Sequence, residues 1–75
     1  MIGKVKPGDV VTYKPREWMG PAVVIGYNDE IERWAVKFTK RNKYTHSCDN
    51  AVGGYRGLWV KGDELEVIGY VGVET

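Results

Sequence analysis

His46 and Cys48 are the residues whose types most directly suggest chemistry, because an imidazole and a thiol can bind a metal or form a nucleophile pair. They lie two positions apart, so both side chains would face the same side of an extended segment. A structural zinc site normally needs four ligands, mostly Cys and His, and this chain has one of each. A nucleophilic thiol would also need an oxyanion hole and a substrate pocket, for which 75 residues offer little volume. We therefore predict that His46 and Cys48 anchor the loop that carries them, with metal binding and catalysis as the alternatives.

A second group of residues mixes cationic and aromatic side chains. Residues 37–61 carry six basic residues against one acidic residue, Asp49. Basic groups neutralise phosphates, and aromatic rings between them can stack on unpaired bases. The pattern therefore indicates nucleic-acid contacts, with the alternative that these charges only keep a loop solvated. The candidate binding residues of this group are Lys40, Arg41, Lys43, Tyr44, Tyr55 and Arg56.

Two further candidates lie between Pro15 and Pro21. Arg16 would extend the basic group if this loop and the later one meet at the same end of the fold. Trp18 would anchor a protein partner, because tryptophan often dominates the binding energy of an interface. The alternative is that Trp18 covers the open end of a small hydrophobic core.

Five short strands must position these residues. Runs of β-branched and aromatic residues with period-two alternation predict strands at 9–14, 22–27, 33–38, 58–60 and 65–68. We expect one 3₁₀ turn near residues 61–64 and no helix longer than that turn. The polar loop 39–57 is long for so small a chain, which favours a functional role for it.

Five strands without a helix predict an all-β fold class. Short strands joined by tight turns expose their edges in an open sheet, and curling the sheet into a small barrel removes most of these edges. We expect a five-stranded, partly open barrel with a long loop before strand 4. The chain, residues 1–75, is predicted to be a single domain with its core at about 7–68. Residues 69–75 would form a tail in which Tyr70, Val71 and Val73 either dock or fray. The predicted core residues are Val11, Tyr13, Val24, Trp34, Val36, Phe38, Trp59, Leu65 and Ile68.

Three stretches resemble SH3-like barrels, including the KOW, Tudor and Mind-bomb-repeat groups. They are the Lys-Pro-Gly-Asp-Val-Val opening at 6–11, the Trp-Ala-Val-Lys-Phe strand at 34–38, and the strand–turn–strand pattern of residues 58–68. The resemblance implies a partly open SH3-like barrel over residues 7–68, and it says little about function because this barrel hosts many unrelated roles. The His-Ser-Cys-Asp stretch at 46–49, with the glycines and Leu-Trp-Val that follow, resembles small uncharacterised proteins of phages, prophages and Gram-positive bacteria.

The likeness to Tudor barrels implies one more alternative, an aromatic cage for methylated cations. Tyr13, Trp18, Trp34 and Trp59 are its candidate residues. We disfavour a cage because the core needs the strand residues Trp34 and Trp59, which leaves only Trp18 free.

Composition narrows the function classes. One cysteine excludes an internal disulfide, so we expect a reducing, cytoplasmic environment. No run of 18 apolar residues is present, and we expect no membrane partner. We predict a non-enzymatic binding module or adaptor of phage or bacterial type that binds a protein partner and has no cofactor and no metal. The alternative is an accessory domain that binds nucleic acid through residues 37–56.

Overall fold

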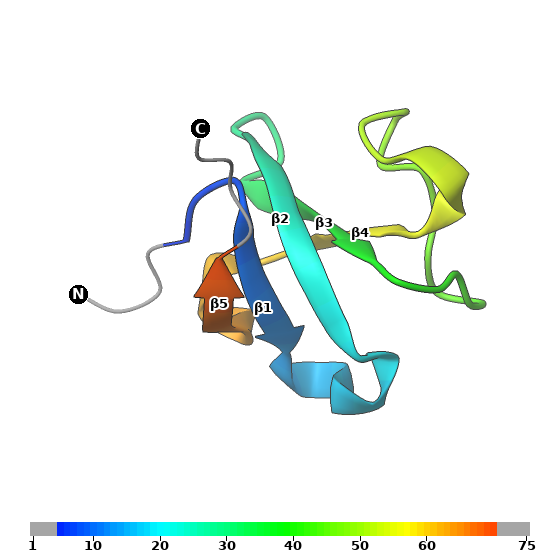
Figure 1. Cartoon of the computed structure of the whole chain (residues 1–75). Coiled ribbons are helices and arrows are strands. Elements are labelled where there is room, and N and C mark those ends of the chain that lie inside the picture. Colours follow the sequence, from blue (N-terminus) through cyan, green and yellow to red (C-terminus); the bar gives the residue numbers. More distant parts are fainter. Residues whose placement is uncertain (1–4, 71–75) are drawn as a thin grey trace.

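One antiparallel sheet of five strands organises the computed structural model, which describes residues 5–70 (Figure 1). The strand order is β4-β3-β2-β1-β5, and the sheet does not close into a barrel. The prediction of an all-β, five-stranded, partly open fold is confirmed, whereas the SH3-like assignment stays a prediction. The strands are β1 (Asp9–Tyr13), β2 (Pro21–Asn28), β3 (Arg33–Phe38), β4 (Gly57–Val60) and β5 (Leu65–Tyr70), with the short 3₁₀ segments η1 (Lys14–Met19), η2 (Gly53–Tyr55) and η3 (Gly62–Glu64).

The main hydrophobic core lies on one face of the sheet, which we call the inner face. Alternation along the strands places Val11, Val24, Val36 and Phe38 on this face, and each is at most 1% exposed. The register opposes Val24 to Val36, so that both strands turn their apolar sets to the same side. The other members of this core are Val5, Tyr13, Met19, Ala22, Val60 and Leu65, with Trp34 and Leu58 packed against them.

Trp59 lies on the opposite face, so its predicted place in the main core is wrong. The register opposes Leu58 to Val36 and Trp59 to Ala35. Leu58 therefore points into the core, and Trp59 points away from it. Trp59 packs instead against a second small cluster formed by Ala35, Cys48 and Val52. We call the face that carries Ala35 and Trp59 the outer face.

Ile68, the other predicted core residue that lies elsewhere, is 55% exposed, so its prediction is wrong. Val10 opposes Gly69 while Val11 opposes Val67, so Ile68 is an extra residue that interrupts the alternation. β5 is an edge strand, and no other strand among residues 5–70 pairs with its free edge. β5 extends through Tyr70, so Gly69 and Tyr70 belong to a strand and not to a tail, and the expectations for Val71 and Val73 lie outside the described residues.

The turn before β1 is closed by Asp9, a charged residue that is only 2% exposed. Its Oδ2 accepts a hydrogen bond from the Lys6 backbone N–H, and its Oδ1 accepts one from Lys6 Nζ, both at 3.0 Å. Gly8, the residue before Asp9, donates its N–H to the Val24 carbonyl at 2.9 Å. The Lys6 side chain is 67% exposed, so the bond to the backbone N–H is the more valuable of the two.

We predict that Asp9→Ala lowers the free energy of unfolding by about 1–3 kcal/mol, because the Lys6 backbone N–H loses its acceptor. Urea denaturation would measure the change. Asp63→Ala is the matched control, since Asp63 is exposed and its replacement should cost less than about 0.5 kcal/mol. Equal midpoints for the two variants would contradict this role of Asp9.

Candidate functional site

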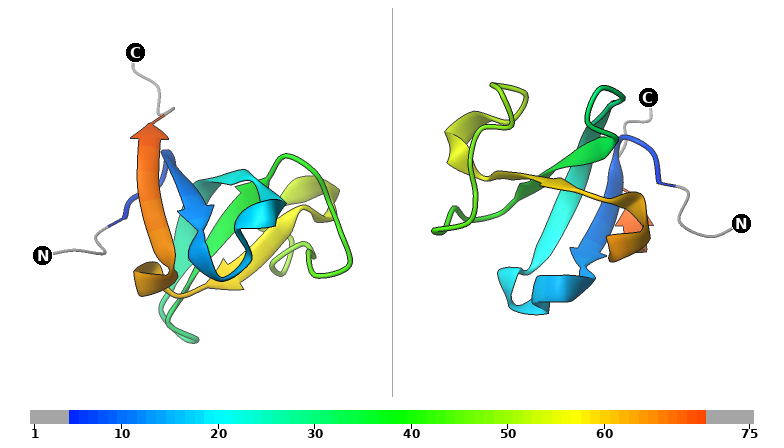
Figure 2. Two further views of the ribbon diagram at one scale, coloured as in Figure 1. Left: turned by 90° about the horizontal axis from the view of Figure 1, so that it is seen from below. Right: turned by 180° about the vertical axis from the view of Figure 1, so that it is seen from behind.

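The long connection between β3 and β4 (residues 39–56, hereafter the β3–β4 loop) doubles back onto the sheet. His46 and Gly57 form an isolated antiparallel bridge. The His46 N–H donates to the Gly57 carbonyl at 2.8 Å, and the Gly57 N–H donates to the His46 carbonyl at 2.7 Å. The bridge divides the loop into a first half that leads away from β3 and a second half that returns to β4. Both halves lie at the β4 side of the sheet, far from β5 (Figures 1 and 2).

Cys48 holds the returning half of the loop against the sheet. It is 1% exposed, and its backbone N–H donates to His46 Nδ1 at 3.0 Å. Cys48, Asp49 and Asn50 all have left-handed φ values, of 51°, 55° and 72°. Such a conformation costs about 1–2 kcal/mol per residue. Burial of Cys48 and the bond from Val52 N–H to the Ser47 carbonyl, 2.9 Å long, offset this cost.

Gly57 makes this close packing possible. A Cβ placed at Gly57 would lie 2.8 Å from Val52 Cβ and 2.9 Å from Cys48 Sγ. These separations are shorter than a van der Waals contact, so any side chain at Gly57 would push the loop away from β4. The glycine therefore determines how closely the loop approaches the outer face.

The surroundings of Cys48 do not favour catalysis or metal binding. Burial, with a smaller contribution from the negative charge of Asp49, raises the pKa of the Cys48 thiol from its ordinary value of 9.0 to about 11. An activated thiol needs the opposite shift. His46 Nδ1 is already occupied as an acceptor for a backbone N–H. Within residues 5–70, no group of three or more His, Cys, Asp or Glu side chains is placed to hold a metal ion.

We predict that Gly57→Ala destabilises the protein by about 1–3 kcal/mol, because it overpacks the contact with Val52 and Cys48. The control is Gly53→Ala, since a Cβ at Gly53 meets nothing within 4 Å. Thermal and urea unfolding of both variants would measure the effect. A Gly57→Ala protein as stable as Gly53→Ala would show that the loop is not packed closely here.

We predict that the folded protein reacts with iodoacetamide at least about 100-fold more slowly than the urea-unfolded chain at the same neutral pH, because a pKa of about 11 instead of 9.0 lowers the thiolate fraction by that factor. The rate should rise about tenfold per pH unit without a plateau below about pH 10. The raised pKa also means that the free energy of unfolding decreases as the pH rises from about 9 towards 11. A plateau near pH 9, or equal rates in the two states, would contradict the burial of the thiol.

The structure brings the two predicted loops together at one point. The Trp18 and Tyr44 rings lie 5.9 Å apart between centroids and are tilted by 57°. Arg16 Cζ lies 4.2 Å from the centre of the Tyr44 ring, and Lys43 Nζ lies 5.3 Å from it. We call Arg16, Trp18, Lys43 and Tyr44 the Trp18 cluster. η1 supplies its first two residues, and the β3–β4 loop supplies the other two.

Trp18 itself is 65% exposed, so the alternative in which it covers the core is wrong. Its neighbour Met19, 9% exposed, packs into the core instead. Successive side chains of a 3₁₀ segment point in directions about 120° apart, which explains why one is buried and the other is not. The aromatic cage is not formed either, because Tyr13 is buried in the core and Trp34 and Trp59 pack on opposite faces.

The other predicted binding residues do not join the Trp18 cluster. Lys40 and Arg41 are exposed in the first half of the β3–β4 loop, and Tyr55 is 62% exposed in its second half. Arg56 Nη1 donates to the Thr39 carbonyl at 3.3 Å, and Arg56 borders a hollow on the outer face. Of the predicted group, only Lys43 and Tyr44 thus join the Trp18 cluster and only Arg56 borders a hollow, while the other three belong to neither surface.

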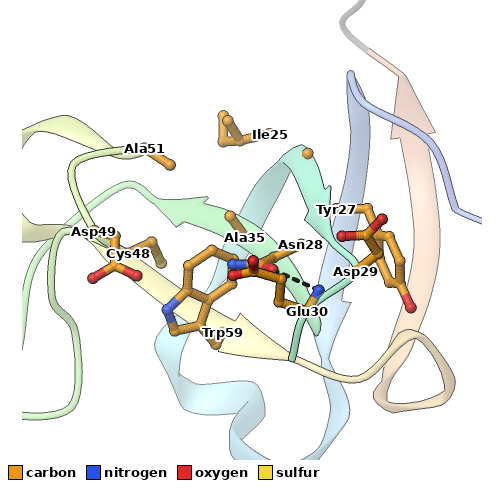
Figure 3. A pocket seen from close by; sticks show the side chains of 11 residues that line it. Ile25, Tyr27, Asn28, Asp29, Glu30, Ala35, Cys48, Asp49, Ala51 and Trp59 are labelled. Carbon is orange, nitrogen blue, oxygen red and sulfur yellow. Dashed lines mark hydrogen bonds between the residues drawn. The ribbon is translucent and has the colours of Figure 1, made fainter. Parts of the chain in front are cut away.

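The outer face is hollowed at two places that the sequence did not reveal. One hollow, of about 410 Å³, lies between the β3–β4 loop and the turn after β2. Figure 3 shows Ala35 and Trp59 in its middle, where Asn28 and Glu30 overlap Trp59 in this view, with Cys48 and Asp49 on one side and Asp29 on the other. The second hollow, of about 500 Å³, lies over Val23 and Lys37. The available signal was a pair of small residues, Gly26 and Ala35, that oppose each other on β2 and β3.

No protein-family model, curated protein or solved structure matches this chain. No helix within residues 5–70 is long and apolar enough to cross a membrane. The fold and its surfaces define a small all-β structure with an exposed aromatic and cationic cluster at one end of the sheet and a hollowed outer face.

Proposed function

We propose that the protein is a non-enzymatic binding module that binds a protein partner through the Trp18 cluster. The observation that carries the proposal is that Trp18 is 65% exposed and yet lies against Tyr44 at 5.9 Å. Exposing so large a ring to water forgoes about 1.5–3 kcal/mol of burial energy in the free protein. A partner that covers the ring would recover that energy.

The position of Trp18 favours tight binding because little freedom is lost on association. Pro15 lies in the first turn of the η1 segment, and buried Met19 attaches the end of the segment to the core. Contact with Tyr44 restricts the ring further. Trp and Tyr are enriched among binding hot spots, and preorganisation lowers the entropic cost of binding. The flanking cations Arg16 and Lys43 favour a partner with an apolar pocket bordered by acidic residues.

Nucleic acid is the second candidate, and the placement of Arg16 over the Tyr44 ring supports it. Arginine stacked on an aromatic ring beside a second exposed ring forms a surface on which unpaired bases can stack. Lys40, Arg41 and Lys43 would then contact phosphates, with no indication of base-specific recognition.

We predict that Trp18→Ala reduces capture of the partner at least tenfold, while Ile31→Ala leaves it unchanged. Ile31 is the control because it is an exposed apolar residue, 44% accessible, in the turn between β2 and β3. Immobilised wild-type protein and both variants would be compared on nuclease-treated bacterial extracts, and the captured protein would then be purified and its dissociation constant measured directly. Equal affinity of the purified partner for wild type and Trp18→Ala would refute the proposal.

Salt dependence distinguishes the two candidates. Short single- and double-stranded oligonucleotides would be titrated into the labelled protein and followed by amide NMR at low and near-physiological salt. Shifts at residues 14–18 and 37–56 that persist at the higher salt would assign the cluster to nucleic acid. Affinity for a protein held by Trp18 and the two flanking cations should fall only modestly with salt, whereas a series of phosphate contacts weakens steeply.

We further infer a cytoplasmic location and a phage or prophage type of protein. The first inference is supported by the single cysteine, which is buried and unpaired as expected in a reducing compartment. The second is supported by the resemblance of residues 46–60 to small phage and prophage proteins.

A further inference from the structure

The two hollows of the outer face follow one another along the same strands. Val23 opposes Lys37 under one hollow, and Gly26 opposes Ala35 under the other, so they lie over consecutive outward-facing rows of β2 and β3. Ile25, the extra residue of the bulge between these rows, borders both. We call the two hollows together the outer-face groove.

The middle of the groove is apolar and has room for a side chain. Ile25 is 37% exposed there, and Trp59 is half-buried beside Ala35. A Cβ built at Gly26 meets nothing within 4 Å, so the space above this strand position is open. Cys48 and Ala51 of the β3–β4 loop form one wall (Figure 3).

The two ends of the groove carry opposite charges. Lys37 and Arg56 border one end. The single bond of Arg56 to the Thr39 carbonyl leaves most of its guanidinium donors for a ligand. Three acidic residues border the other hollow, Asp29 and Glu30 from the turn after β2 and Asp49 from the β3–β4 loop. A ligand that matches both ends must therefore be negative at one end, apolar in the middle and positive at the other.

The spacing of the ends fits a short extended peptide. The distance between Lys37 at one end and Asp29 at the other can be measured along β3. Lys37 lies four residues from Arg33, about 13 Å at ~3.3 Å per residue, and Arg33 opposes Asn28, the residue before Asp29. An extended peptide covers the same distance in about four residues. We propose that the outer-face groove binds an extended peptide segment that carries an acidic and a basic side chain about four positions apart, with an apolar side chain between them.

Other ligand classes fit the groove less well. A nucleic acid would bring phosphates to Asp29, Glu30 and Asp49, where like charges repel them. The groove is also distinct from the Trp18 cluster, because none of the four residues of that cluster lines either hollow. The proposal therefore does not depend on the function proposed for Trp18.

The test begins with a displayed library of random peptides, selected against the wild-type protein. Enriched peptides should place a carboxylate and a cationic side chain about four positions apart around an apolar residue, in either order. Each would then be synthesised and titrated, with affinity read by fluorescence and the binding site read by amide NMR shifts. Shifts should concentrate at Val23, Ile25 and Ala35.

Two variants test the groove itself. Gly26→Phe should fill the open space and weaken binding at least tenfold, whereas Gly53→Phe, the same substitution at a glycine outside the groove, should leave it unchanged. Lys37→Glu should weaken binding, and a peptide whose acidic residue is replaced by lysine should recover it. Amide spectra of each free variant would verify that it is folded.

Several results would overturn the proposal. They are a library without enrichment, peptides that bind Gly26→Phe as tightly as wild type, and peptides whose binding is lost only in Trp18→Ala. The last of these would support the function proposed for the Trp18 cluster while removing the groove as a site. A concentration-dependent dimer that Gly26→Phe abolishes would instead assign the groove to a second copy of the chain.

Discussion

The contact between the β3–β4 loop and Gly57 shapes the surfaces of this protein. Without a side chain at Gly57, Val52 and Cys48 lie directly on β4, and the bridge from His46 to Gly57 holds both ends of the loop's second half. The loop thereby becomes one wall of the outer-face groove. Its first half, ahead of the bridge, carries Tyr44 back to η1, where it meets Trp18. Both candidate surfaces therefore depend on one close backbone approach.

β3 is the strand on which the two faces of the sheet meet. Val36 is fully buried on the inner face, and Ala35 is 2% exposed on the outer face. The inner face supplies most of the buried apolar area and hence most of the stability. The outer face is covered only where the loop lies, so the rest of it stays open to a ligand. At the other edge of the sheet, β5 exposes Val67 and Ile68, and Lys6 Nζ lies 4.8 Å from the Tyr70 ring centre.

The net charge of +1 conceals a separation of charge that only the fold reveals. In the sequence, Asp49 is the one acidic residue in a basic stretch. In the structure it lies across a hollow from Asp29 and Glu30, which come from the turn after β2. Arg56, a member of the same basic stretch, borders the other end of the groove. Sequence neighbours therefore contribute to surfaces of opposite sign.

Period-two alternation and turn residues in the sequence determined the five strands, the all-β class and most of the inner core, because these signals are local. The side of Trp59 and the exposure of Ile68 were not predictable, since the first depends on which face of β4 the register selects and the second on a β-bulge. The candidate residues could be named from their types. Only the tertiary structure decided which of them meet, as Arg16 and Trp18 meet Tyr44, and where the outer face is hollow. The reason is that a long loop has no periodic pattern, so its path follows from packing against distant residues such as Gly57.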